Sequence, residues 1–106
     1  MRIALAPLNP TVGDLEHNTS LIVDAIERAR GAGCDVVVTP ELALSGYPPK
    51  DLLYRATFVR ACAAAAKRIG EERTSGITLV LGTPLPTHPG EPESGVANSL
   101  VVYRDG

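Results

Sequence analysis

The chain has 106 residues, of which 44% are hydrophobic and 21% charged, and its net charge is −2. This composition is typical of one globular domain and excludes a disordered chain. Its basic residues are scattered and its aromatic residues are three Tyr and one Phe, which excludes the positive stripe and stacking platform of a nucleic-acid-binding protein. It contains no signal peptide pattern, no apolar run of membrane-spanning length and only two cysteines, so we expect a reduced, cytoplasmic protein.

The first third of the chain predicts a strand followed by an amphipathic helix. Residues 2–6 form a short apolar run without helical spacing, which predicts a buried strand. Pro7 ends its regular pairing, because proline lacks the N–H that a ladder needs. Apolar residues at helical spacing then form one stripe: Leu21, Ile22, Ala25, Ile26 and Ala29. Acidic residues at 14 and 16 and glycines at 31 and 33 match the preferences of helix ends.

The middle of the chain predicts a second strand, an irregular segment and a second helix. Val36–Val38 is a β-branched run of strand length, expected to be buried on both faces. Residues 41–50 contain a glycine and two prolines and are expected to be irregular. The second helix is expected to begin near Asp51, as N-cap, and to run to about Arg73 with a break near residues 55–56. Its predicted apolar stripe comprises Leu52, Phe58, Val59, Cys62, Ala65, Ala66 and Ile69.

The last third predicts two strands separated by a long loop. Residues 77–81 and 97–103 are the expected strands, and residues 83–95, with four prolines, the expected loop. The resulting order (β-α-β-α-β-β) is that of an α/β domain that begins with parallel pairing and ends on a hairpin-like return. The final Asp-Gly dipeptide is a hairpin-turn signal without a following strand, so we expect the chain to stop within a larger structure.

Glu41 is the candidate for chemistry. It follows the second strand, at the carboxyl edge where α/β sheets collect ligands, and lies between Pro40 and three apolar residues. Partial burial raises the pKa of a carboxylate, which makes this residue a candidate general base or acid. From the residues alone, a carboxylate that accepts backbone N–H groups is the commoner arrangement. Tyr47, on the same loop, is a candidate for lining a pocket, although most loop tyrosines cover a core edge.

The cysteines and histidines are expected to be structural or exposed. Cys34 lies at the amino end of the second strand, and Cys62 lies on the helix stripe, where a small apolar residue packs well. His17 and His88 have no second ligand at metal spacing, so we expect no metal site. The glycines at 31 and 33 close a helix, whereas the glycines that cradle phosphates open one.

Several segments resemble the carbon–nitrogen hydrolase (nitrilase-like) family. The opening of the chain is similar to that of the family in residues 4–6, residues 8–14 (Leu-Asn-Pro-Thr-Val-Gly-Asp) and Asn18. Residues 38–49 resemble its first catalytic motif, and residues 81–84 and 98–101 also fit. The pairing of Asn-Pro-Thr-Val-Gly-Asp with Gly-Tyr-Pro-Pro-Lys-Asp-Leu-Leu resembles the glutaminase domains of the glutamine-dependent NAD synthetase branch. Pro7 and Thr39 depart from the family, which commonly has Gln and a bulky apolar residue there.

The resemblance implies the first portion of an αββα sandwich, with residues 1–106 as an incomplete glutaminase domain and the synthetase domain absent. It also implies a Glu–Lys–Cys hydrolase in which Glu41 is the general base and glutamine the substrate. The family's lysine and cysteine motifs lie outside this chain, and Lys50, Lys67, Cys34 and Cys62 do not match them. ATP and magnesium are implied for the synthetase domain, with no cofactor in this segment, and the complete protein is expected to be a homo-oligomer.

Three other functions remain open at this point. The first is a non-catalytic α/β binding or regulatory module on a nitrilase-like scaffold, and the second is another amidase of the superfamily. The third is a small doubly wound nucleotide-binding domain, which the missing glycine fingerprint disfavours. A lysine and a cysteine at the family's positions further along the reading frame would distinguish the enzyme from the module.

Overall fold

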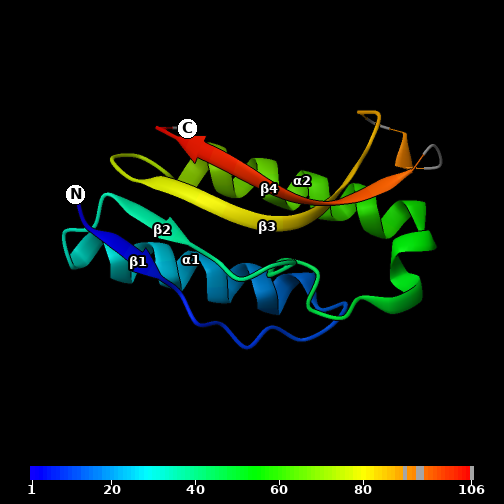
Figure 1. Ribbon diagram of the computed structural model, residues 1–106, viewed down its shortest axis with the longest axis horizontal. Helices are drawn as coiled ribbons and strands as arrows, with labels where there is room; N and C mark the ends of the chain where they lie inside the picture. The colour runs from blue at the N-terminus through cyan, green and yellow to red at the C-terminus, as the bar shows by residue number, and fades with distance from the viewer. Residues whose placement is uncertain (90, 93–94, 106) are drawn as a thin grey trace.

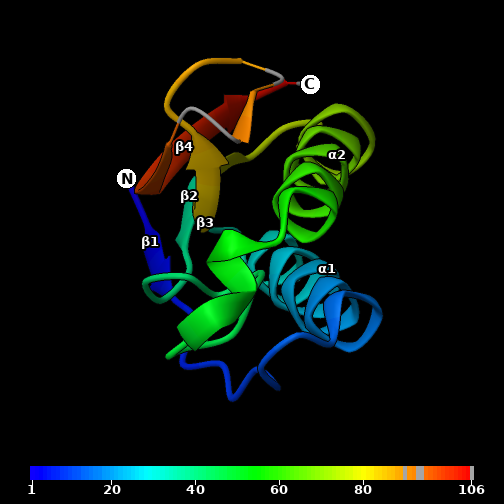
Figure 2. The same cartoon turned by 90° about the vertical axis from the view of Figure 1, so that its right-hand side faces the viewer.

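The computed structural model describes residues 1–89, 91–92 and 95–105, apart from the side chain of Lys50. A sheet of four strands carries two long helices on one of its faces (Figures 1 and 2). Its strands lie in chain order: β1 (Ile3–Leu5), β2 (Val36–Val38), β3 (Thr78–Pro86) and β4 (Val96–Arg104). The first three strands are parallel, and β4 pairs antiparallel with β3. This arrangement confirms the expected α/β class and element order.

Helix α1 (Leu15–Gly31) forms where the apolar stripe predicts it. Asp14 is its N-cap, because one carboxylate oxygen accepts a hydrogen bond from the His17 N–H at 3.0 Å. Basic residues at positions 28 and 30 occupy its last turn, where they complement the negative end of the helix dipole. Ile22 and Ile26 of this stripe are fully buried in the core.

The second helical region is interrupted, as expected. A short 3-10 helix, η1 (Lys50–Tyr54), is separated from α2 (Ala56–Arg73) by the extended residue Arg55. The expectation that Asp51 caps this region was wrong: Pro49 precedes η1, and no side chain caps either helix. The ring of Pro49 already holds a helical φ of −75°, so the turn starts before Asp51. No helix in the described ranges is long and apolar enough to cross a bilayer.

Strand β3 is longer than predicted, because residues 83–86 of the expected loop continue it. Even-numbered residues of β3 direct their backbone groups towards β2, as the N–H of Gly82 shows by donating to the Thr39 side chain. Pro84 and Pro86 share that direction by the alternation of a strand, and β2 has already ended at their level. Their missing N–H groups therefore cost no ladder hydrogen bond with β4.

The core lies between the sheet and the helices, and the other sheet face is largely open (Figure 2). Towards the helices, Ala4, Val37, Leu79 and Tyr103 stand in one row across the strands. On the opposite face the large apolar residues Ile3, Leu5, Leu100 and Val102 are between 57% and 76% exposed. The expected full burial of the first two strands was therefore wrong here, since only the face that packs on the helices is covered.

The final Asp-Gly turn is described only in part. Asp105 has a positive φ of 54°, as turn residues of this kind do, and its carboxylate accepts the Gly76 N–H at 3.1 Å. Gly106 lies outside the described residues.

Candidate functional site

Glu41 lies at the carboxyl edge of the sheet, where β2 continues into a tight turn. Thr39 extends the strand, because its N–H donates to the Val80 carbonyl of β3 at 3.0 Å. Residues 41–45 then form turns, which confirms the irregular segment expected from the glycine and prolines. The turn therefore presents Glu41 at the edge where parallel strands of α/β proteins bind ligands.

Strand β3 fixes this turn through Gly82. Its N–H donates to the Thr39 Oγ1 at 3.0 Å, and its carbonyl accepts the Leu44 N–H at 3.2 Å. A Cβ at position 82 would overlap the Pro40 carbonyl and lie 2.8 Å from the Leu42 N. The hydroxyl of Thr39, a departure from the family pattern, thus serves as the acceptor that joins the turn to β3.

Leu42, directly after Glu41, adopts a left-handed backbone conformation. Its φ is +50°, which is uncommon and strained for a residue other than glycine, and its side chain is buried. Its carbonyl accepts the Gly46 N–H at 2.9 Å and the Ser45 hydroxyl at 3.3 Å. Burial and hydrogen bonds together hold this strained residue, so the direction of the Glu41 backbone is fixed.

Asn18 ties the first loop of the chain to the same turn. Its fully buried side chain accepts the Thr11 N–H at 2.8 Å and donates to the Thr11 carbonyl at 2.8 Å and the Leu44 carbonyl at 3.0 Å. Gly46, with a φ of +82°, passes so close to Val12 that a Cβ would lie 2.6 Å from its Cα. The loop before α1 and the Glu41 turn therefore form one rigid unit.

A hollow of about 500 Å³ opens beside Glu41. The first loop contributes Leu8, Asn9 and Pro10, and the turn contributes Pro40, Glu41 and Tyr47. The structure thus brings Glu41 and Tyr47, the two site residues predicted from the sequence, to one hollow. Glu41 is exposed, so the expected partial burial was wrong, and Tyr47 is 65% exposed.

The hydrogen-bond partner of Glu41 is a side chain that sequence reasoning did not single out. Asn98 of β4 donates from Nδ2 to the Glu41 Oε1 at 2.6 Å, across 57 residues of sequence. This arrangement differs from the carboxylate with backbone N–H partners considered above. A signal was present in the sequence, because asparagine is disfavoured in strands and here stands among strand-forming residues.

The two cysteines lie away from this hollow. Cys34 precedes β2 at the end opposite Glu41, and Cys62 is fully buried on α2. Burial raises the pKa of the Cys62 thiol to about 12, so it stays protonated at neutral pH and is no thiolate nucleophile. His17 and His88 are exposed, and among the described residues no group of three or more His, Cys, Asp or Glu side chains is placed to hold a metal. Lys67 is exposed and forms an ion pair with Glu71.

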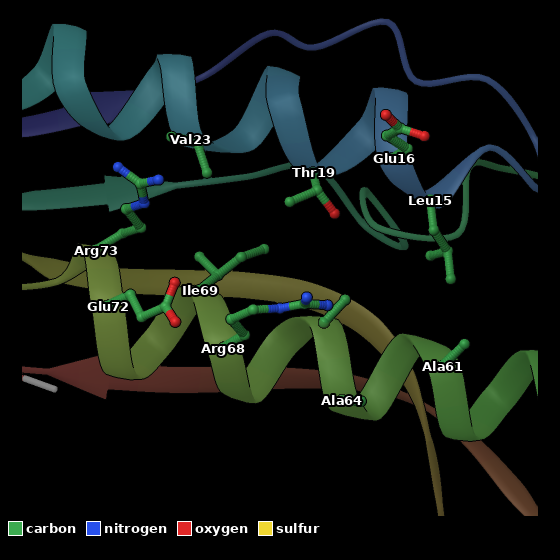
Figure 3. A pocket seen from close by; sticks show the side chains of 11 residues that line it. Leu15, Glu16, Thr19, Val23, Ala61, Ala64, Arg68, Ile69, Glu72 and Arg73 are labelled. Carbon is green, nitrogen blue, oxygen red and sulfur yellow. The ribbon is translucent and has the colours of Figure 1, made fainter.

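A second hollow of about 540 Å³ lies between α1 and α2 (Figure 3). Leu15, Thr19 and Val23 of α1 line one side, opposite Ala64 and Ile69 of α2. Charged residues border it, and Glu41 does not contribute to it. Hydrogen bonds from the Arg30 guanidinium to the carbonyls of Arg73 and Ser75 join the two helices nearby. This groove is a helix–helix boundary rather than part of the Glu41 site.

Comparison with known proteins gives a consistent set of relatives. The family model described as carbon–nitrogen hydrolase matches residues 2–105. The chain is 41% identical over 106 residues to a glutamine-dependent NAD(+) synthetase of Synechocystis sp., covering 98% of this chain and 19% of that protein. It is 35% identical over 107 residues to the enzyme of the same name from Thermotoga maritima, covering 100% of this chain and 18% of that protein. The chain thus spans about a fifth of the length of these curated relatives.

Solved structures show the same fold. A glutamine-dependent NAD(+) synthetase from Cytophaga hutchinsonii superposes with a TM-score of 0.88 at 28% identity, covering 99% of this chain and 17% of that one. An amidase from Nesterenkonia sp. superposes with a TM-score of 0.70 at 37% identity, covering 84% of this chain and 34% of that one. A glutamate-to-glutamine mutant of that amidase shows Michael addition of acrylamide at its active site cysteine.

Proposed function

The chain belongs to the carbon–nitrogen hydrolase family, and from this premise we propose that it forms the first part of a glutaminase domain. The complete domain hydrolyses glutamine and supplies ammonia to a separate synthetase domain. There, ATP and magnesium support the amidation of deamido-NAD to NAD. Relatives that carry the name glutamine-dependent NAD(+) synthetase at 41% and 35% identity support this assignment. The complete enzyme is proposed to act in the cytoplasm as a homo-oligomer.

The observation that carries the proposal is the placement of Glu41. Its carboxylate stands at the carboxyl edge of β2, on a turn fixed by β3, and faces a hollow rather than the core. One oxygen, Oε1, is held by Asn98 at 2.6 Å, which leaves Oε2 for a proton. A fixed, accessible carboxylate with one engaged oxygen is what a general base requires.

The proposed reaction begins with transfer of a proton from a cysteine thiol to Glu41. The resulting thiolate attacks the side-chain carbonyl of glutamine, and a lysine stabilises the negative oxygen of the tetrahedral intermediate. Glu41 then returns the proton to the departing nitrogen, so ammonia leaves and an acyl-enzyme remains. Water, activated by the same carboxylate, releases glutamate and restores the thiol.

The cysteine and the lysine are proposed to come from segments outside residues 1–106. Cys62 is buried and protonated, and Cys34 lies at the wrong end of β2, so neither reaches Glu41. The Nesterenkonia amidase, with its active site cysteine, is consistent with a nucleophile in this family. Tyr47, on the rim of the same hollow, is proposed to form part of the wall that receives the substrate.

The test compares residues 1–106 with the protein encoded by the whole reading frame, which we expect to contain the lysine and the cysteine. The whole protein should release ammonia from glutamine, and residues 1–106 alone should show no turnover. Ammonia release by the isolated chain that is lost in Glu41→Gln would refute the division of the catalytic residues. No glutaminase activity in the whole protein would favour the non-catalytic binding or regulatory module instead.

A further inference from the structure

We propose that Asn98 is the positioning residue of the general base: its amide holds Glu41 Oε1 so that Oε2 is directed at the nucleophile. This inference rests on the proposed role of Glu41 and adds a residue to it. The contact joins Asn98 Nδ2 to Glu41 Oε1 at 2.6 Å. This is a short distance for an N–H donor, in keeping with a hydrogen bond to a charged acceptor, since such bonds are shorter and stronger than neutral ones.

Both partners of this hydrogen bond are held in place by the same strand, β3. The turn that carries Glu41 is fixed to Gly82 of β3 by hydrogen bonds of 3.0 and 3.2 Å. Asn98 pairs with Pro84, two residues further along β3. The separation of carboxylate and amide is therefore set by one strand, and the contact needs no flexible segment to form it.

The side chain of Asn98 lies on the open face of the sheet. Along β4 it shares a face with Leu100 and Val102, both more than 60% exposed, because alternate residues of a strand point the same way. An asparagine costs strand propensity at this position, and its amide serves no ladder hydrogen bond. The described contact that it makes is with Glu41, which gives the amide a role at the site.

A neutral donor suits a carboxylate that must act as a base. An amide N–H stabilises the ionised carboxylate without neutralising its charge, and it leaves the lone pairs of Oε2 available. Of the residues that line the hollow, Glu41 and Tyr47 are the titratable ones. The turn at residues 39–46 and the part of β4 at residues 96–102 carry no other charged side chain. Within these segments, Glu41 is therefore the charged group on which removal of the donor acts; in the full-length enzyme the proposed lysine is a further charge, and it is the same in every variant.

The experiment measures kcat/KM for glutamine hydrolysis against pH in the full-length enzyme with Asn98→Leu and Asn98→Asp. Loss of the donor should lower the rate by about tenfold to a hundredfold, the usual effect of removing a partner that orients a catalytic group. The acidic limb of the profile should move to higher pH, because the ionised base loses a donor. Asn98→Asp should move it further, because a second carboxylate then faces Glu41.

Two controls separate this role from a structural one. Ser99→Ala removes a neighbouring polar side chain of β4 whose hydroxyl donates to the Ala97 carbonyl, and should leave rate and profile unchanged. Activity driven by free ammonia should survive in all three variants, because it needs only the synthetase domain, and an unchanged thermal unfolding transition shows that the glutaminase domain of each is folded. An equal loss of rate at every pH, without movement of the acidic limb, would assign Asn98 a structural role and overturn the proposal. A wild-type rate and profile in both Asn98 variants would also overturn it.

Failure of the inference about Asn98 can be distinguished from failure of the proposed function. If the unmodified full-length protein releases no ammonia from glutamine, the proposed function fails. If Glu41→Gln keeps the glutamine-driven activity, Glu41 is not the base, and Asn98 has no base to position. If Glu41→Gln loses that activity while the Asn98 variants behave as wild type, the base is correct and only its positioning by Asn98 is wrong.

Discussion

Gly82 determines how closely β3 approaches the turn that carries Glu41. A Cβ there would overlap the Pro40 carbonyl, which belongs to backbone and cannot rotate away. We predict that Gly82→Ala in the full-length enzyme displaces the turn, costs about 1–3 kcal/mol of stability and reduces glutamine hydrolysis. Thermal unfolding and ammonia release measure the two effects.

Gly31→Ala is the matched control for that substitution. Gly31 ends α1, and a Cβ added there meets nothing within 4 Å. This change should be neutral or stabilising by up to about 1 kcal/mol, because alanine is the better helix residue. Equal behaviour of Gly82→Ala and Gly31→Ala would show that the close approach of β3 does not position the turn.

The importance of a single residue could be predicted where the neighbouring sequence alone indicates it. Glu41 was identified from the sequence because a carboxylate between a proline and apolar residues, just after a strand, is unusual locally. Its contact with Asn98 was not, because the two residues are 57 apart in the sequence and meet only through the register between β3 and β4. The three hydrogen bonds of Asn18 were missed for the same reason: one partner, Leu44, lies 26 residues away.

Elements were predictable where periodicity and end signals agree. Helix α1 followed from its apolar stripe, the acidic residues at its start and the glycines at its end, and the break before α2 was also predicted. Strand β3 was predicted to end too early, since the prolines at 84 and 86 read as loop residues. A strand tolerates these prolines only if their missing N–H groups do not face a neighbouring strand, and this depends on the tertiary structure.

The open face of the sheet leads to a prediction about β4 and β1. Its apolar side chains are exposed in residues 1–106, and contiguous exposed apolar surface favours association. We predict that the isolated chain self-associates, and that Val102→Lys raises the concentration at which it does so. Sedimentation velocity over a concentration series measures the association.

Tyr54→Lys provides the comparison, because Tyr54 is 90% exposed but lies in η1 and not in the sheet. It should leave the association unchanged. A monodisperse monomer at high concentration, with one cooperative unfolding transition, would contradict the prediction. In the proposed complete domain this face is the surface on which the second sheet of the sandwich packs.

At the scale of the whole molecule, we propose that the chain holds one side of the glutaminase site. It spans about a fifth of the length of its curated relatives, and its hollow is lined by the first loop and the Glu41 turn. We propose that the remaining side, with the nucleophile and the lysine, is supplied by segments that cover the open sheet face.

The most direct test of the account is Glu41→Gln in the full-length enzyme, measured with both nitrogen sources. The substitution keeps the size of the side chain and removes the basic oxygen. Glutamine-driven NAD formation should fall by roughly a hundredfold to ten-thousandfold, the usual contribution of a positioned proton acceptor. Formation driven by free ammonia should persist, because it needs neither glutamine hydrolysis nor this carboxylate. Persistence of the glutamine-driven activity would contradict the role of Glu41 as base, and loss of both activities together would show that the carboxylate is structural.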